Sequence, residues 1–178
     1  MPAVISTTGK LSRELYELDD REHDKANRFY MVGSMGCASA FGLGVSRGTR
    51  QPVVVLDGDG ALLMKLGTLA TIGWKGGSHV HHVVIDNAAH ESTGAQVTAS
   101  PNVDFAGVAL SCGYKRAATV ATVDDFARTL EDQLASKGPT FLRMLVTTGS
   151  RKNLGRPRLS PRACYERFAG WLKEREKS

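Results

Sequence analysis

The sequence predicts an α/β protein whose doubly wound, mostly parallel sheet carries helices on both faces. Short apolar runs at 53–56, 80–85 and 140–146 alternate with longer segments of helical periodicity. The first two runs are continuous rather than alternating, which is typical of strands buried on both sides. The first run, a glycine turn, a helical segment and the second run form a βαβ unit, whose crossover is right-handed and whose strands are parallel.

The bulk composition fits one domain. A chain of 178 residues with 42% hydrophobic content can bury a proper core. We expect an N-terminal segment with a short helix at 1–28, a main domain at 29–148, and a basic tail with a C-terminal helix at 149–178 that packs on the same domain. No signal pattern opens the chain, and no apolar stretch approaches the ~20 residues that span a bilayer. We therefore expect a cytoplasmic protein without a membrane partner.

The net charge of +5 does not indicate a nucleic-acid partner. The basic residues are dispersed or gathered near the C-terminus, and no aromatic residues are interleaved with them on one face. An anionic cofactor and substrate explain the charge equally well. Cys37, Cys112 and Cys164 are too few and too widely spaced for a disulfide framework or a zinc site, so we expect reduced, buried thiols.

The N-terminal third gives weaker patterns. We expect a mobile arm at 1–8, a helix at 11–18 with Leu11, Leu15 and Leu18 on one face, and a charged loop at 19–27 that holds a solvated His23. The first strand is predicted at 29–32. A tight turn at 33–36 then leads into a helix at 37–44 that is rich in glycine and alanine. Glycine costs about 1 kcal/mol inside a helix, so its repeated use implies close approach by another backbone or a cofactor.

The rest of the chain completes the alternation. We predict helices at 62–72, 102–112, 123–136 and 161–176, and strands at 114–120 and 140–146. The first of these helices ends at the Gly76-Gly77 break. In the tail, Arg151, Lys152 and Arg156 are interpreted as solvated residues, with an anionic site or a partner chain as the alternative.

Polar residues follow two of the predicted strands directly. Asp59 and Asn87 lie at carboxyl ends of neighbouring parallel strands, where ligands of such sheets bind. Gly58 and Gly60 allow a sharp turn, and the amides that open the next helix attract an anion. A diphosphate carrying Mg²⁺ would use both features, because Mg²⁺ takes a few protein oxygens with phosphate and water. A backbone carbonyl just beyond Asn87 is a third candidate ligand.

Histidines occur at both ends of the second strand. His79, His81 and His82 precede its apolar part, so we interpret them as strand-entry residues rather than as a metal pair. His90, Glu91 and Ser92 follow Asn87 at the open end of the sheet, where loops carry substrate chemistry. They are candidates for contacting substrate or phosphate, and the alternative is an ordinary helix start with a serine or threonine cap.

The Gly58-Asp59-Gly60 turn, followed after 26 residues by Asn87, resembles the cofactor motif of the thiamine-diphosphate-dependent decarboxylase superfamily. The resemblance implies that Asp59, Asn87 and the main-chain oxygen of Ala89 ligate Mg²⁺. It also implies that amides around Gly60 and Ala61 hold the diphosphate of thiamine diphosphate. An ordinary turn with two polar caps is the alternative.

The turn Gly33-Ser34-Met35 matches the segment that lies beneath the aminopyrimidine in this superfamily. The resemblance implies that the Gly33 carbonyl and the Met35 amide bond the pyrimidine. The Met35 side chain would force the bent cofactor shape. A methionine that fills a gap in the core is the alternative.

A closer resemblance covers the chain from about Ser12 onward. The runs FYMVGSMGCASAFGLG, LDGDGALLMKLGTLATIGW and VVIDNAAHESTGAQVT resemble phosphonopyruvate decarboxylases and, less closely, sulfopyruvate decarboxylases. The latter tend to carry Tyr and Gly where this chain has His90 and Glu91. The resemblance implies decarboxylation of 3-phosphonopyruvate, an anionic 2-keto acid, to phosphonoacetaldehyde. His90 and Glu91 are then the catalytic candidates, and Ser92 joins the cofactor contacts.

The superfamily activates its cofactor with a glutamate from a pyrimidine-binding domain. We expect that glutamate on a separate alpha subunit, in a hetero-oligomer of alpha-beta pairs, so that this chain alone is inactive. The alternatives are a sulfopyruvate decarboxylase beta subunit, another thiamine-diphosphate carboligase or decarboxylase subunit, and a nucleotide-binding regulatory module.

Overall fold

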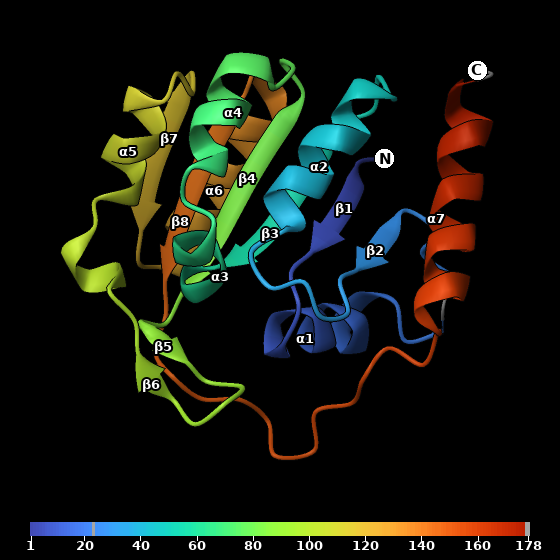
Figure 1. Cartoon of the computed structure of the whole chain (residues 1–178), viewed down its shortest axis with the longest axis horizontal. Helices are drawn as coiled ribbons and strands as arrows, with labels where there is room; N and C mark the ends of the chain where they lie inside the picture. The colour runs from blue at the N-terminus through green and yellow to red at the C-terminus, as the bar shows by residue number, and fades with distance from the viewer. Residues whose placement is uncertain (23, 177–178) are drawn as a thin grey trace.

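A computed structural model of the chain describes residues 1–22 and 24–176, so His23 lies outside the described residues. Its centre is a six-stranded sheet in the order β2-β1-β3-β4-β8-β7, with every neighbouring pair parallel (Figure 1). The strands of this sheet are β1 (Ala3–Ser6), β2 (Arg28–Tyr30), β3 (Val53–Gly58), β4 (Val80–Asp86), β7 (Arg116–Val120) and β8 (Thr140–Leu145). The predicted fold class is confirmed.

Helices cover both faces of the sheet. They are α1 (Lys10–Asp19), α2 (Ala38–Arg47), α3 (Asp59–Met64), α4 (Thr68–Lys75), α5 (Phe105–Ser111), α6 (Val123–Ala135) and α7 (Pro161–Glu176), with a 3-10 turn η1 (Ser100–Asn102). A short hairpin of β5 (Ala89–His90) and β6 (Gln96–Val97) lies beyond the carboxyl ends of the strands, as does the segment that joins β8 to α7 (Figure 1). These outlying pieces surround the edge at which we expect ligands.

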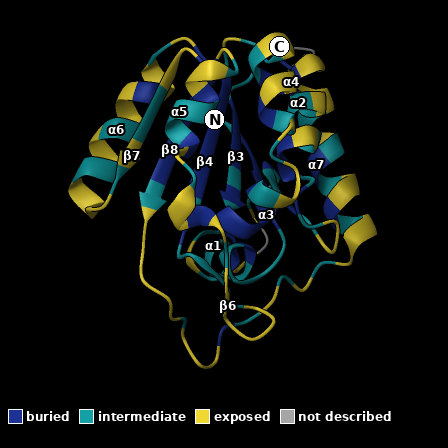
Figure 2. Cartoon of the chain, turned by 60° about the vertical axis from the view of Figure 1, so that its left-hand side comes forward, coloured by how far each residue is buried: buried dark blue, intermediate teal, exposed yellow. Residues whose placement is uncertain are grey.

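Alternate residues of each strand pack on opposite faces, as the pleat requires. On one face, Ile5 and Val55 join side chains of α2 and α7, and further along the sheet Val84 joins α3, α4 and α5. On the other face, Val4 and Val83 pack against α1 and α6. The inner strands β1, β3 and β4 are therefore buried on both sides, and the helices are exposed mainly on their outer surfaces (Figure 2).

The expectation of a mobile arm at 1–8 is wrong. Residues 3–6 form β1, an inner strand between β2 and β3 whose four residues are all buried. The strand predicted at 29–32 is consequently the second one and lies at the edge of the sheet. The amphipathic face of α1 also differs, because Ser12 and Tyr16 are buried while Leu18 is 85% exposed.

Two other boundaries differ from the prediction. The helix expected at 62–72 is two helices, because the chain leaves helical geometry at Lys65 before α4 begins. The helix expected from residue 102 begins at Phe105, after η1, with the side chain of Asp104 capping Gly107. Among the cysteines, Cys164 is buried, whereas Cys37 and Cys112 are half-buried; all three are free thiols.

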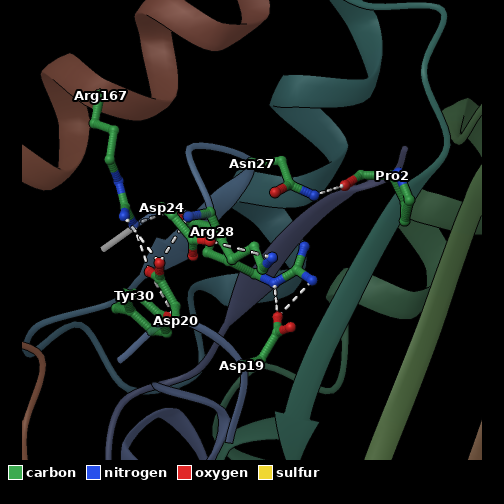
Figure 3. Close-up of polar contacts among 9 residues, drawn as sticks. Pro2, Asp19, Asp20, Asp24, Asn27, Arg28, Tyr30 and Arg167 are labelled. Carbon is green, nitrogen blue, oxygen red and sulfur yellow. Dashed lines mark hydrogen bonds and ion pairs between the residues drawn. The ribbon is translucent and has the colours of Figure 1, made fainter. Parts of the chain in front are cut away.

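The C-terminal helix is fixed to the N-terminal part of the chain through Asp20 (Figure 3). The fully buried Asp20 carboxylate accepts hydrogen bonds from the Arg167 guanidinium of α7 and from the Tyr30 hydroxyl of β2. Burial and the neighbouring Asp20 charge raise the pKa of Tyr30. Arg28 pairs with Asp19 alongside, at 2.5 Å. In the part of the chain that the structure describes, no helix is both long and apolar enough to cross a membrane.

Candidate functional site

The carboxyl ends of three neighbouring strands meet at one cavity of about 150 Å³. Thr7 follows β1, Asp59 follows β3, and Asn87 follows β4. The cavity is lined by Thr7, Thr8, Lys10, Leu11, Glu14, Met35, Gly58, Asp59, Gly60, Ala61, Ile85, Asn87, Ala89, His90, Glu91, Ser92, Val146, Thr147 and Gly149. Ten of the twelve candidate cofactor residues are in this set, and the other two, Gly33 and Ser34, lie exposed in the turn after β2.

Asp59 is the first residue of α3 and its side chain is buried, with 2% exposure. Its Oδ2 accepts a hydrogen bond of 2.5 Å from the Thr98 hydroxyl. Burial raises the pKa of the Asp59 carboxyl, and the Thr98 hydrogen bond acts against that rise. A carboxylate desolvated at a ligand-binding edge is stabilised by a cation, so this side chain fits a metal ligand.

The turn that follows β4 orients the other proposed ligands. Ala88 has a positive φ of 55°, and the Asn87 Oδ1 accepts the Ala89 amide at 3.1 Å. The Asn87 Nδ2 donates to Glu91 at 2.9 Å. These two contacts define which side of the Asn87 carboxamide carries the oxygen and which carries the nitrogen. An oxygen set of carboxylate, amide and carbonyl suits Mg²⁺. Among the described residues, no three His, Cys, Asp or Glu side chains are grouped as a metal site.

A buried network behind this turn holds it in place. Asp86 Oδ1 accepts the Ala88 amide at 2.9 Å, and its Oδ2 accepts the Arg143 guanidinium at 2.7 Å and the Ser100 hydroxyl. Arg143 comes from β8 and also bonds the carbonyls of Ser100 and Val103. The turn is therefore tied to the adjacent strand and to η1.

At the start of α3, neighbouring side chains occupy the space that a Cβ on Gly60 would take. A Cβ on Gly60 would lie 2.5 Å from His90 Cε1 and 3.4 Å from Met35 Cε. The His90 ring and the Met35 thioether therefore lie close to the amides that open α3. Met35 belongs to a turn with positive φ at Gly33, Ser34 and Gly36, which carries its side chain to the cavity.

Glu91 connects three separate segments at the cavity. Its Oε1 accepts the Lys10 ammonium and the Gly149 amide, each at 2.9 Å, and its Oε2 accepts the Asn87 amide. Residues 91–95 form the turn of the β5–β6 hairpin, so the alternative of a helix start after Asn87 is wrong. The sequence predicts Glu91 near Asn87, whereas its contacts with Lys10 and Gly149 depend on the packed fold.

Three cavity residues were missed because β1 was missed. Thr7 and Thr8 belong to the loop between β1 and α1, and Lys10 is the first residue of α1. The signal was present, since the apolar run 3–5 is followed by Ser-Thr-Thr-Gly and a helical segment, the same order as strand, turn and helix around Gly58. Of the tail residues, Arg151 pairs with Glu17 at 2.6 Å, and Arg156 lines a second cavity beside α1.

The histidines of β4 are not strand-entry residues, because His81 and His82 lie inside the strand and are buried. His81 Nδ1 is 2.9 Å from the Thr140 hydroxyl, and burial lowers the pKa of His81 to about 4. His82 Nε2 lies 3.5 Å from Asp57 Oδ2 on the opposite face of the strand. Neither lines the cavity.

The cavity fits a magnesium-bound diphosphate on its own chemistry. The Thr7 hydroxyl is buried and has no hydrogen-bond partner among the described residues, so a donor is left for an anionic oxygen. The buried Asp59 carboxylate and the Asn87 turn supply metal-type oxygens. The amides that open α3 face the same cavity.

Known proteins are similar to this chain in sequence and in fold. Residues 8–144 match the family model of the thiamine pyrophosphate enzyme C-terminal TPP binding domain. The chain is 47% identical to a phosphonopyruvate decarboxylase of Streptomyces viridochromogenes over 96% of its own length, and it spans 42% of the length of that relative. It is 39% identical to the sulfopyruvate decarboxylase subunit beta of Methanocaldococcus jannaschii, over 74% of this chain and 68% of the subunit.

A solved structure shows the same fold. It is described as a putative thiamin diphosphate-dependent enzyme from Mycobacterium smegmatis, with a TM-score of 0.64 and 23% identity over 83% of this chain and 29% of that one. The family model covers well over half of the chain. This chain therefore belongs to the C-terminal TPP binding domain family of thiamine pyrophosphate enzymes.

Proposed function

We propose that the chain is the diphosphate-binding subunit of a thiamine-diphosphate- and Mg²⁺-dependent decarboxylase. Its reaction would convert 3-phosphonopyruvate into phosphonoacetaldehyde and carbon dioxide. The observation that carries the proposal is the meeting of Asp59, the Asn87 turn and the start of α3 at one cavity. The similarity to a phosphonopyruvate decarboxylase over nearly the whole chain supports the substrate.

In this proposal the chain anchors the diphosphate end of the cofactor. Asp59, Asn87 and the Ala89 carbonyl hold Mg²⁺, while amides at Gly60 and Ala61 bind phosphate oxygens. Gly58, at the carboxyl end of β3, has no side chain and would let the diphosphate approach the backbone closely. Ser92 would add a hydroxyl to the lining of the cavity. These proposed roles are supported by the position of all of these residues on the lining of one cavity.

The turn after β2 would hold the other end of the cofactor. Bound thiamine diphosphate supplies an electron sink for the charge left when carbon dioxide departs. Met35 would set the bent shape of the cofactor, and Gly33 and Ser34 would present backbone groups to its pyrimidine. The Met35 side chain is the part of this turn that lines the cavity.

His90 is the proposed proton-transfer or phosphonate-binding residue. Its ring lies against Gly60 at the cavity, and histidine exchanges protons near neutral pH. Glu91 is placed beside it by three hydrogen bonds and would act on the site through Asn87 and Lys10.

We also propose that a separate pyrimidine-binding alpha subunit completes the site by contributing the activating glutamate. The relative from Methanocaldococcus jannaschii, which this chain covers over 68% of its length, is named as a beta subunit, and this supports a split arrangement. Within this chain, residues 29–148 would form most of the binding domain, to which 1–28 adds the inner strand β1 and onto which 149–178 would pack.

The decisive experiment is a decarboxylation assay on 3-phosphonopyruvate with thiamine diphosphate and Mg²⁺. This chain would be tested alone and with its pyrimidine-binding partner. We expect activity in the pair, its loss in Asp59→Ala, and no change in Asp124→Ala, a matched carboxylate exposed on α6. Full activity of the single chain would refute the split arrangement.

Sulfopyruvate decarboxylation is the second candidate, supported by the 39% identity to a sulfopyruvate decarboxylase subunit beta. The two substrates differ in the anionic group, so parallel assays separate them. Turnover of sulfopyruvate alone would transfer the assignment to it. Carbon-carbon bond formation with an added aldehyde would instead indicate a carboligase. Failure to bind thiamine diphosphate at all would indicate a regulatory module.

A further inference from the structure

Lys10 lines two neighbouring cavities. It is the first residue of α1 and lines the cavity of Asp59 and Asn87. Of the described residues around that cavity it is the one lysine or arginine, among the carboxylates of Glu14, Asp59 and Glu91. It also lines the second cavity, of about 440 Å³, together with Thr8 and Ser92.

Glu91 holds the Lys10 ammonium in this position. The two charged atoms are 2.9 Å apart, and the side chains are only 29% and 16% exposed. A lysine ammonium has three N–H donors, and the bond to Glu91 uses one of them. The other carboxylate oxygen of Glu91 is engaged by Asn87, so Glu91 is itself held from the metal side of the cavity.

The loop around Lys10 offers further donors to an anion. Thr7 is 3% exposed, lines the same cavity, and its hydroxyl has no hydrogen-bond partner among the residues described. Gly9, the N-cap of α1, provides no side-chain cap for the amides of the first turn, where the helix dipole favours negative charge. Lys10 and Thr7 therefore bring a cation and a buried hydroxyl to one cavity, and the start of α1, which has no side-chain cap, lies beside them.

We propose that Lys10 binds a tetrahedral phosphorus oxyanion, with Thr7 beside it and Glu91 as its positioning residue. Two molecules could present this group, the diphosphate of the cofactor and the phosphonate of the substrate. The second source rests on the proposed function. Oxyanion binding itself does not, because it can be measured without turnover.

The test uses the full chain with Mg²⁺ and two unreactive probes, inorganic pyrophosphate and phosphonoacetate, whose dissociation constants are measured by titration calorimetry. We expect Lys10→Met to weaken binding of at least one probe by about tenfold to a hundredfold, because charge-assisted hydrogen bonds are lost. Lys10→Arg should retain most of the affinity. Lys115→Met, at an exposed site at the opposite end of the strands, should change it less than twofold.

The results with the two probes distinguish the two possible sources of the oxyanion, the cofactor and the substrate. If Lys10→Met weakens the binding of pyrophosphate only, Lys10 contacts the cofactor. If it weakens the binding of phosphonoacetate only, Lys10 contacts the substrate. If it weakens the binding of both probes, the two groups share one subsite. Unchanged binding in Lys10→Met, or no binding of either probe to the unmodified chain, overturns the proposal. Binding by a chain that fails to decarboxylate phosphonopyruvate with its partner would leave the oxyanion site standing and refute only the proposed function.

Discussion

The Asn87 side-chain amide donates to the Glu91 carboxylate at 2.9 Å while its oxygen accepts the Ala89 amide at 3.1 Å. The two contacts define the orientation of the whole carboxamide. A residue that ligates a metal through one oxygen depends on such a contact, because rotation would present the NH₂ group to the cation instead.

Loss of the Glu91 acceptor should therefore weaken Mg²⁺ binding. We expect Glu91→Ala to lower Mg²⁺ affinity, in the presence of pyrophosphate, by about tenfold to a hundredfold. Glu91→Gln should lose less, because its side-chain oxygen can still accept from Asn87. Calorimetric titration of Mg²⁺ measures both. Equal losses in the two variants would show that the hydrogen bond to Asn87 is not the cause.

Two glycines of α2 should respond in opposite directions to alanine. A Cβ on Gly42 would overlap Val55 of β3, whereas nothing lies within 4 Å of a Cβ on Gly44. We expect Gly44→Ala to raise the free energy of unfolding by about 1 kcal/mol and Gly42→Ala to lower it by about 1–2 kcal/mol. Urea denaturation of the two variants measures this. A stabilising Gly42→Ala would contradict the close packing of α2 on the sheet.

Removal of the cation beside Asp20 should destabilise the fold. In Arg167→Met the fully buried Asp20 carboxylate loses its guanidinium, at an expected cost of about 3 kcal/mol. Arg162→Met, on the same helix, breaks an exposed pair with Glu166 and should cost less than about 0.5 kcal/mol. Denaturation midpoints compare the two. Similar midpoints would show that Asp20 does not depend on α7.

His81 should make the protein acid-sensitive. Its pKa is lowered by burial from 6.5 to about 4, so between these values the unfolded chain binds a proton that the folded chain does not. This stabilisation is complete above pH 6.5 and is lost as the pH falls toward 4, by up to about 3 kcal/mol. His81→Asn should flatten this part of the stability profile. An unchanged slope between pH 6.5 and 4 would contradict the assignment.

Most of the fold could be predicted because the longer strands carry strong patterns. The runs that became β3, β4 and β8 are mostly apolar, with polar residues inside β4 and β8, and each is bounded by glycine or polar residues. β1 was not recognised because it has only four residues next to the terminus, and its burial depends on neighbours on both sides. The apolar run and the turn after it are visible in the sequence, but the pairing that makes the run an inner strand is not.

The candidate site likewise has residues that the sequence predicted and contacts that it did not. Asp59 and Asn87 follow recognisable strands, so topology alone predicted that they meet. The contacts of Glu91 with Lys10 and Gly149 join residues 81 and 58 positions apart in the chain. Such pairs are set by the packed fold, and no spacing rule reveals them. The helix predicted at 62–72 is also divided at Lys65, and the first turn of α3 lines the cavity.

The inner position of β1 has a consequence for how the protein folds. Ala3 pairs with Val53, so β1 gains β3 as its inner neighbour only after about fifty further residues have been made. Parallel pairs between distant segments form slowly, because loop closure must precede the contact. We therefore expect the Thr7 loop and the Asp59 turn to come together late in folding, with premature exposure of β1 as the main risk of aggregation during synthesis.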